Sequence, residues 1–358
     1  MISILLMFLV LAAGMAIVRY MFPHKYTWPE FFGSMAVLLV VLSVSYELSL
    51  MSKASDTQIL SGKVVGKTRE VVPCEHSYPC HCHEVCEGSG RNESCSQECD
   101  TCYEHPFDVD WDVQTTVGTL SIDREDSQGL VKPQRWSAVQ IGEPASVAST
   151  YQNYIKAVPG SLYNRTSNEP TPEYPATIYD YYHIDRVVDY DLHAPKADLA
   201  SLNEEISDEL RDVAGQKQVN LVIVLVDASK HGQMFVQDLK AAWLGGKKND
   251  LVIVIASSQY PKIEWDDVFS WSKDDLVNVT VRDSIRDYGK IDNHVVELAV
   301  DGIVHHWTRK RMHEYEYLKR EIEPSVTAYV IIFLIGGLVS FGSAFFFIKN
   351  ADNFNRYN

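Results

Sequence analysis

The stretch from Lys217 to Ser258 decides the fold. It contains Gln218-Val-Asn-Leu-Val-Ile-Val-Leu-Val226, the polar turn Asp227-Ala-Ser-Lys-His-Gly232, and Leu251-Val-Ile-Val-Ile-Ala256. The two apolar runs are of strand length and rich in Val and Ile, and a short helical pattern lies between them at Met234–Trp243. Continuous apolar strands joined by a helix predict a right-handed βαβ unit in a sheet that is covered on both faces.

The flanking segments extend this unit into an α/β sandwich over residues 185–301. Asp198–Val213 is an amphipathic helix, with apolar residues at steps of three and four and acidic residues on the other face. The remaining predictions are a loop or broken helix at Lys262–Leu276, a short strand at Val277–Val281, and one long helix at His294–Glu323 that includes a helical stalk, residues 302–323.

Three apolar segments, residues 1–22, 31–51 and 325–348, are each long enough to cross a hydrocarbon core of ~30 Å. The sequence therefore predicts an integral, multi-pass membrane protein in contact with membrane lipid. In the last segment Gly336, Ser340 and Ala344 recur every four residues. Such a stripe of small residues permits close helix contact, either with the chain's own helices or with a second copy or another membrane protein.

The charges that flank these segments give two opposed signals about sidedness. Arg19 near the end of the first segment, with His24 and Lys25 after it, favours a cytoplasmic first loop, with the large block outside and the C-terminus inside. A basic cluster before the last segment favours a cytoplasmic block: Arg309, Lys310, Arg311, Lys319 and Arg320. Long domains cross membranes largely regardless of charge, so we expect the block to be extracytoplasmic.

The first part of the block, residues 52–160, carries strand patterns. The pattern of Gln58–Val72 predicts a twisted strand or a tight hairpin. Apolar residues alternate over Asp108–Ile122, which is typical of a half-buried strand. The other predictions are a strand at Trp136–Ile141, a weak helix at Ala145–Val158 and a Pro- and Tyr-rich connector over residues 161–184.

All seven cysteines lie in an insert in this β-rich part, residues 74–105. They are interleaved with histidines: Cys74, His76, Cys80, His81, Cys82, His83, Cys86, Cys95, Cys99, Cys102 and His105. About thirty residues with few aliphatic side chains cannot form a core, so the insert must be cross-linked locally. Up to three disulfides with one cysteine left over would suit an extracytoplasmic block.

Zinc is the alternative chemistry for the insert. Cys99-Asp-Thr-Cys102 is a C-x-x-C knuckle, and Cys80, Cys82 and Cys86 could complete a site. The odd number of cysteines and the nearby histidines favour zinc, whereas the expected topology favours disulfides. With either chemistry we interpret the insert as a structural staple and not as a catalytic centre.

Acidic residues at or after the predicted strand ends are the second candidate site: Asp189, Asp191, Asp227, Asp266, Asp267, Asp274 and Asp275. Ligands of open α/β sheets collect at the carboxyl ends of strands, and calcium and other hard divalent cations prefer several oxygen ligands. Solvated loop acids are the competing interpretation. The formal net charge of -16 argues against a nucleic-acid partner and against electrostatic docking to anionic lipid.

Two segments, Val187-Val-Asp-Tyr-Asp191 and Trp243-Leu-Gly-Gly-Lys-Lys-Asn-Asp-Leu-Val-Ile-Val-Ile-Ala256, resemble the TPM-domain family. Asp189, Trp243, Gly245 and Asn249 match its pattern, and the resemblance covers roughly residues 187–301. It implies a small α/β sandwich beside a membrane helix. Asp250 stands where the family has Gly, and Phe269-Ser-Trp-Ser272 replaces its Gly-rich loop.

The resemblance implies two functions. Some TPM members are assembly or accessory modules, and others are divalent-cation-dependent phosphatases that act through loop carboxylates. Because the Gly-rich loop is absent from the sequence, we favour a non-enzymatic interaction or assembly module and keep the phosphatase as the alternative.

Overall fold

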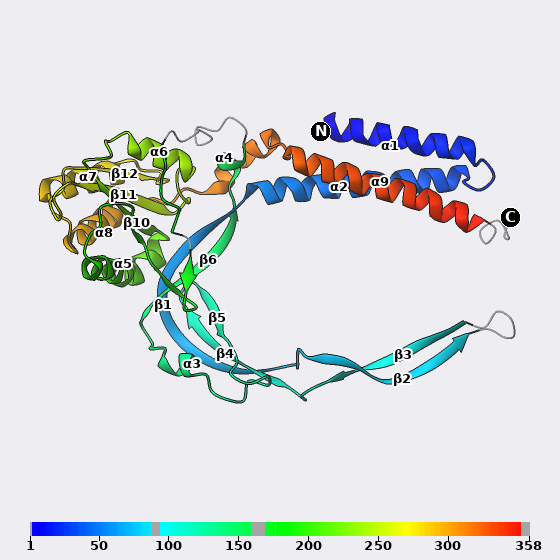
Figure 1. The fold of residues 1–358 in the computed structure, drawn as a ribbon, viewed down its shortest axis with the longest axis horizontal. Helices are drawn as coiled ribbons and strands as arrows, with labels where there is room; N and C mark the ends of the chain where they lie inside the picture. Colours follow the sequence, from blue (N-terminus) through cyan, green and yellow to red (C-terminus); the bar gives the residue numbers. More distant parts are fainter. Residues whose placement is uncertain (1, 88–93, 159–168, 176, 352–358) are drawn as a thin grey trace. The chain divides into compact units, whose positions relative to one another are not determined.

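The computed structural model describes residues 2–87, 94–158, 169–175 and 177–351 (Figure 1). The chain forms two compact units. The membrane unit comprises residues 1–56, 150–164 and 311–358, and the head unit comprises residues 57–149 and 165–310.

Three helices of the membrane unit are long and apolar enough to cross a membrane: α1 (Ile2–Met21), α2 (Trp28–Ala54) and α9 (Val326–Lys349). They confirm the three apolar segments of the sequence and make the chain a membrane protein. Their shared core buries Leu11, Met15, Leu38, Leu42 and Ile332.

The small-residue stripe of α9 packs against the other two helices of the same chain. A Cβ atom added to Gly336 would lie 2.8 Å from Leu11 Cδ1 of α1 and 2.9 Å from Leu42 Cδ2 of α2. Ser340 and Ala344 are buried one and two turns further on. The stripe therefore makes the intrachain contact, which was one of its two predicted uses.

Two short helices complete the membrane unit, α4 (Tyr154–Ala157) and the 3₁₀ helix η2 (Met312–Glu321). The continuous helix expected from His294 to Glu323, and with it the helical stalk, is wrong. The α8 helix ends at His306, and Trp307 adopts an extended backbone. The Trp307 indole is buried and donates to the Lys217 carbonyl over 3.0 Å, and this packing turns the chain out of its helical path.

The β-rich part of the head unit is a four-stranded sheet in the order β5-β4-β1-β6. Its strands are β1 (Ser55–Val72), β4 (Asp108–Thr115), β5 (Gly118–Ile122) and β6 (Pro144–Gln152). The alternation seen over Asp108–Ile122 places Val109, Trp111 and Val113 in one core with Val64. Gln58–Val72 lies within a single strand and does not form the alternative hairpin.

Two predictions in this part are wrong. Trp136–Ile141 is not a strand, because α3 (Gln134–Ala138) begins directly after Pro133. The Trp136 indole donates to the Asp112 carbonyl over 2.9 Å, which fixes the helix against β4. Ala145–Val158 is not one helix, because small and β-branched residues up to Gln152 pair beside β1 as strand β6.

The α/β part contains a second four-stranded sheet, in the order β12-β11-β10-β9 (Figure 1). Its strands are β9 (Val187–Asp189), β10 (Asn220–Asp227), β11 (Asp250–Ser257) and β12 (Trp265–Ser270). The pairs β9–β10 and β10–β11 are parallel, and β12 is antiparallel to β11. Because α6 (Phe235–Ala242) joins the parallel strands β10 and β11, the predicted βαβ connection is present.

Helices cover both faces of this sheet. Leu221, Ile223 and Leu225 of β10 face a core shared with α5 (Lys196–Lys217), α7 (Leu276–Tyr288) and α8 (His294–His306). Val222, Val224 and Val226 face α6 on the other side. This burial of both faces explains why the strands are continuously apolar.

Two further predictions in the α/β part are wrong. Val277–Val281 belongs to α7, because Val277, Val281 and Ile285 recur every four residues and are all fully buried. Lys262–Leu276 contains the edge strand β12. Its two consecutive acidic residues, Asp266 and Asp267, interrupt the alternation of polar and apolar residues that would have predicted a strand. The connector over residues 161–184 lies partly outside the described residues, and its last part forms the ribbon β7 (Ile178–Tyr179) with β8 (His183–Ile184).

Candidate functional site

The first candidate site lies at the carboxyl ends of the parallel strands, where Asp191 follows β9 and Asp227 ends β10. The Asp191 carboxylate accepts from the Asp227 N–H at 2.8 Å and lies 3.1 Å from His231 Nε2. Lys230 Nζ lies 3.3 Å from a carboxylate oxygen of each aspartate. The structure thus brings two of the predicted acids together with a lysine and a histidine; we call these four residues the acidic-end cluster.

Lys230 offsets part of the negative charge of the two carboxylates. Hydrogen bonds from the Ser229 hydroxyl and N–H lower the pKa of Asp227. Burial opposes ionisation of Asp191, but the Asp227 N–H, Lys230 and His231 outweigh it and lower the pKa of Asp191. The same carboxylates raise the pKa of Lys230. The lysine ammonium therefore lies within hydrogen-bonding reach of both carboxylates.

The other predicted acids have separate partners. Asp189 accepts three backbone N–H groups, from Leu192, His193 and Ala194, and so shapes the turn after β9. Asp266 is buried on β12 and pairs with Arg286 at 3.1 Å, whereas Asp267 accepts from the Val268 N–H. Asp274 accepts from the Leu276 N–H, and Asp275 precedes α7.

The other residues that match the TPM pattern also hold the fold. The Trp243 indole donates to the Pro172 carbonyl at 2.8 Å. Gly245 has a φ of 81°, which suits glycine, and its carbonyl accepts from the buried Trp271 indole at 2.7 Å. The Asn249 side chain donates to the Ile59 carbonyl of β1.

Arg186 is the centre of a buried polar network that the sequence did not predict. Its Nε donates to Asn220 Oδ1 at 2.9 Å, its Nη2 donates to the hydroxyls of Ser61 and Ser146 at 2.8 and 2.6 Å, and its Nη1 donates to Ser207 at 3.3 Å. Ser61 lies on β1 and Ser146 on β6, so one side chain joins the β-rich part to the α/β part. Burial lowers the pKa of Arg186 to about 10, which leaves the side chain charged at neutral pH.

Asp250 is the acidic end of this network. Its carboxylate accepts from Asn220 Nδ2 at 3.0 Å, from the Tyr174 hydroxyl at 2.7 Å and from the Lys247 N–H at 2.7 Å. Asn220 thus bridges Arg186 and Asp250. The sequence gives only a weak indication of this network: Asn220 and Asp250 are polar first residues of the otherwise apolar strands β10 and β11.

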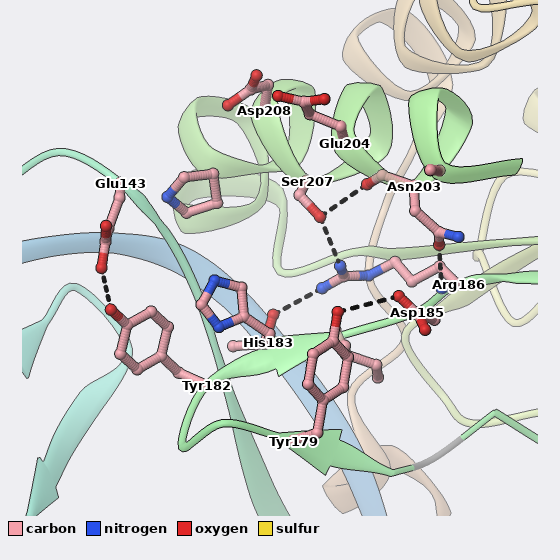
Figure 2. A pocket seen from close by; sticks show the side chains of 14 residues that line it. Glu143, Tyr179, Tyr182, His183, Asp185, Arg186, Asn203, Glu204, Ser207 and Asp208 are labelled. Atoms are coloured by element: carbon pink, nitrogen blue, oxygen red, sulfur yellow. Dashed lines mark hydrogen bonds between the residues drawn. The ribbon is translucent and has the colours of Figure 1, made fainter. Parts of the chain in front are cut away.

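A cavity of about 400 Å³ lies beside Arg186, lined by residues of β6, the β7–β8 ribbon and α5. Figure 2 shows the Tyr182 hydroxyl donating to Glu143 and the Tyr179 hydroxyl donating to Asp185. The His183 ring stacks on both tyrosines.

The cysteine insert forms the hairpin β2 (Ser77–Glu87) with β3 (Ser94–Tyr103). Two disulfides cross it, Cys80–Cys102 and Cys82–Cys99. The side chains of Cys86 and Cys95 lie outside the described residues, but the strand register places their backbones opposite each other. The C-x-x-C cysteines are therefore paired with cysteines of the other strand and do not form a zinc knuckle.

The predicted histidines differ in their surroundings. His81 and His83 are exposed on the hairpin, and the His76 carbonyl accepts from the Glu104 N–H at the hairpin's base. His105 is partly buried beside Cys74. Of the five cysteines whose side chains the structure describes, only Cys74 is free, and it is buried.

We expect each disulfide to stabilise the hairpin locally. The Cys82–Cys99 disulfide lies inside the loop that Cys80–Cys102 closes. When one disulfide is removed, the other still constrains most of this loop in the unfolded chain. The free energy of unfolding should therefore fall by only about 1–2 kcal/mol. The C82S/C99S variant should therefore show faster amide exchange within residues 77–103 by mass spectrometry, while β10 and β11 exchange as in the wild type. Equal acceleration in both regions would contradict an independently stapled hairpin.

Comparison with protein-family models, with curated proteins and with solved structures finds no match for this chain.

Proposed function

We propose that this membrane protein presents a TPM-like domain, residues 185–301 of the head unit, as a non-enzymatic interaction or assembly module. The observation that carries the proposal is the pairing of Lys230 with both Asp191 and Asp227 in the acidic-end cluster. The residues behind the family resemblance support it as well, since the contacts of Asp189, Trp243, Gly245 and Asn249 stabilise the fold.

The sidedness of the module forms part of the proposal. Disulfides persist in oxidising compartments, so the two disulfides of the hairpin favour an extracytoplasmic head unit. The hairpin also offers exposed aromatic surface, because Tyr78 is 48% and Tyr103 57% exposed. Tyrosines with an apolar ring and a polar hydroxyl are frequent anchors of protein interfaces.

The second candidate function is a divalent-cation-dependent phosphatase. The observation in its favour is the meeting of Asp191, Asp227 and His231 at the ends of adjacent parallel strands. For a cation to bind there, the Lys230 ammonium would have to leave the two carboxylates. The two candidates therefore differ in the part that Asp191 plays.

An assay of phosphate-ester hydrolysis separates the candidates. The purified full chain is incubated with p-nitrophenyl phosphate and with magnesium, calcium or manganese in turn. The module proposal predicts the same background rate for wild type, Asp191→Asn and the control Asp267→Asn. A metal-dependent rate that falls at least ~100-fold in Asp191→Asn alone would contradict the module and support the phosphatase.

A further inference from the structure

Cys74, His105 and Asp108 converge where the hairpin joins the β-rich sheet. Cys74 lies between β1 and β2, His105 follows β3, and Asp108 begins β4 opposite Val72 of β1. Cys74 Sγ lies 3.7 Å from His105 Nδ1, and that nitrogen lies 3.2 Å from Asp108 Oδ1. The three ligand atoms all lie within 4.8 Å of one another.

Two of these separations are close to the edges of a tetrahedral zinc site. Bonds of ~2.3 Å to sulfur, ~2.05 Å to nitrogen and ~2.1 Å to oxygen at tetrahedral angles give edges of about 3.6 Å for S–N and about 3.4 Å for N–O. The observed values of 3.7 and 3.2 Å agree with both edges. Cys74 Sγ and Asp108 Oδ1 also converge on the same ring nitrogen, and a single proton on Nδ1 can point at only one of them.

The surroundings hold the carboxylate in place. Asp108 is fully buried, and its other oxygen accepts from Arg124 Nη1 at 3.0 Å and from the Glu75 N–H at 3.1 Å. Such contacts to the outer oxygen fix a ligating carboxylate. Two anionic ligands would balance the charge of a zinc ion, and the thiolate disfavours the hard cations calcium and magnesium.

We infer that Cys74, His105 and Asp108 form a zinc site that ties the two ends of the hairpin together. Binding releases the thiol proton to solvent, and water fills the fourth position. The site is separate from the disulfides, and it accounts for one reduced, buried cysteine in an insert whose other described cysteines are paired. Without zinc, the same atoms would be linked by hydrogen bonds, from the Cys74 thiol to the His76 carbonyl and from His105 to Asp108.

The test is metal analysis of the purified full chain after it has been dialysed against zinc and then desalted. We expect about one zinc ion per chain in the wild type, and a loss of at least ~10-fold in Cys74→Ser and His105→Gln. Asp110→Asn is the matched control, because Asp110 binds the same Arg124 at 2.6 Å but is not among the three ligands. It should retain zinc, as should His81→Gln and His83→Gln.

A second measurement needs no substitution, so it does not depend on whether a variant folds. Wild-type chain loaded with cobalt(II) should show a thiolate-to-cobalt charge-transfer band. The absence of this band, or a zinc content in Cys74→Ser equal to that of the wild type, would overturn the inference. Zinc lost with His81→Gln or His83→Gln and kept with His105→Gln would also overturn it, because the metal would then belong to the exposed histidines.

Discussion

Arg186→Ala should lower the free energy of unfolding of the head unit by ~3–5 kcal/mol, the cost of removing one partner from a buried charged network. The change leaves Asn220 and the hydroxyls of Ser61, Ser146 and Ser207 without the guanidinium that they contact. It also removes one of the positive charges that interact with the buried Asp250. Denaturant titration of the full chain, followed by tryptophan fluorescence, measures the change, since six of the seven tryptophans lie in the head unit.

Two further variants test whether the lost stability comes from the hydrogen-bonding geometry of Arg186 or from the loss of a positive charge. Arg186→Lys keeps the charge but replaces a planar fork with one amino group, and it should lie between the wild type and Arg186→Ala. Arg282→Ala is the matched control, because the Arg282 side chain lies near the surface and pairs with the exposed neighbour Asp283. Its effect should stay within ~0.5 kcal/mol. An Arg186→Ala effect as small as that of the control would contradict the role assigned to the network.

Asp250→Asn should remove a pH dependence of stability that is confined to mildly acidic pH. Burial raises the pKa of Asp250 from 3.8 to about 6, although hydrogen bonds from Asn220, Lys247 and Tyr174 act in the opposite direction. The folded state therefore binds the proton more tightly than the unfolded state does. Between about pH 4 and pH 6 this carboxyl lowers the free energy of unfolding as the pH rises.

The size of this effect follows from the two pKa values. A difference of about two units corresponds to ~3 kcal/mol, which is fully lost above pH 6 and fully present below pH 4. Denaturant titrations of wild type and Asp250→Asn at a series of pH values isolate the contribution, because other titrating groups cancel in the difference. A difference that stays constant from pH 4 to pH 7 would contradict the raised pKa.

The sequence predicted those elements whose side chains follow a regular period over enough residues. The membrane helices, the amphipathic α5 and the continuously apolar β10 and β11 belong to this group. The sequence did not predict short elements whose tertiary contacts overrode the local pattern. Trp307 ends α8 through its contact with Lys217. Strand β6 forms because it pairs beside β1. Val277–Val281 fits both periods over five residues, and only Ile285 reveals the helical one.

The candidate sites were predictable to a similar degree. Strand ends indicated where Asp191 and Asp227 meet, but not that Lys230 would pair with both or that the other five predicted acids would lie apart from them. The clustering of cysteines predicted local cross-links, yet the disulfide pairs depend on the register of two strands. Arg186 was missed because some of its partners come from distant parts of the chain, such as Ser61. Asp108 was missed because its burial depends on the pairing of β4 with β1.

The most direct test of the proposed extracytoplasmic module is the response of the head unit to externally added protease. The full chain is produced in cells with a C-terminal tag. Protease is then added to the intact cells, or to spheroplasts where an outer envelope shields the membrane. The account predicts that protease digests the head unit while the tag after α9 stays protected until the membrane is lysed. A protected head unit with a digested tag would contradict it, since the head unit would then lie in the cytoplasm.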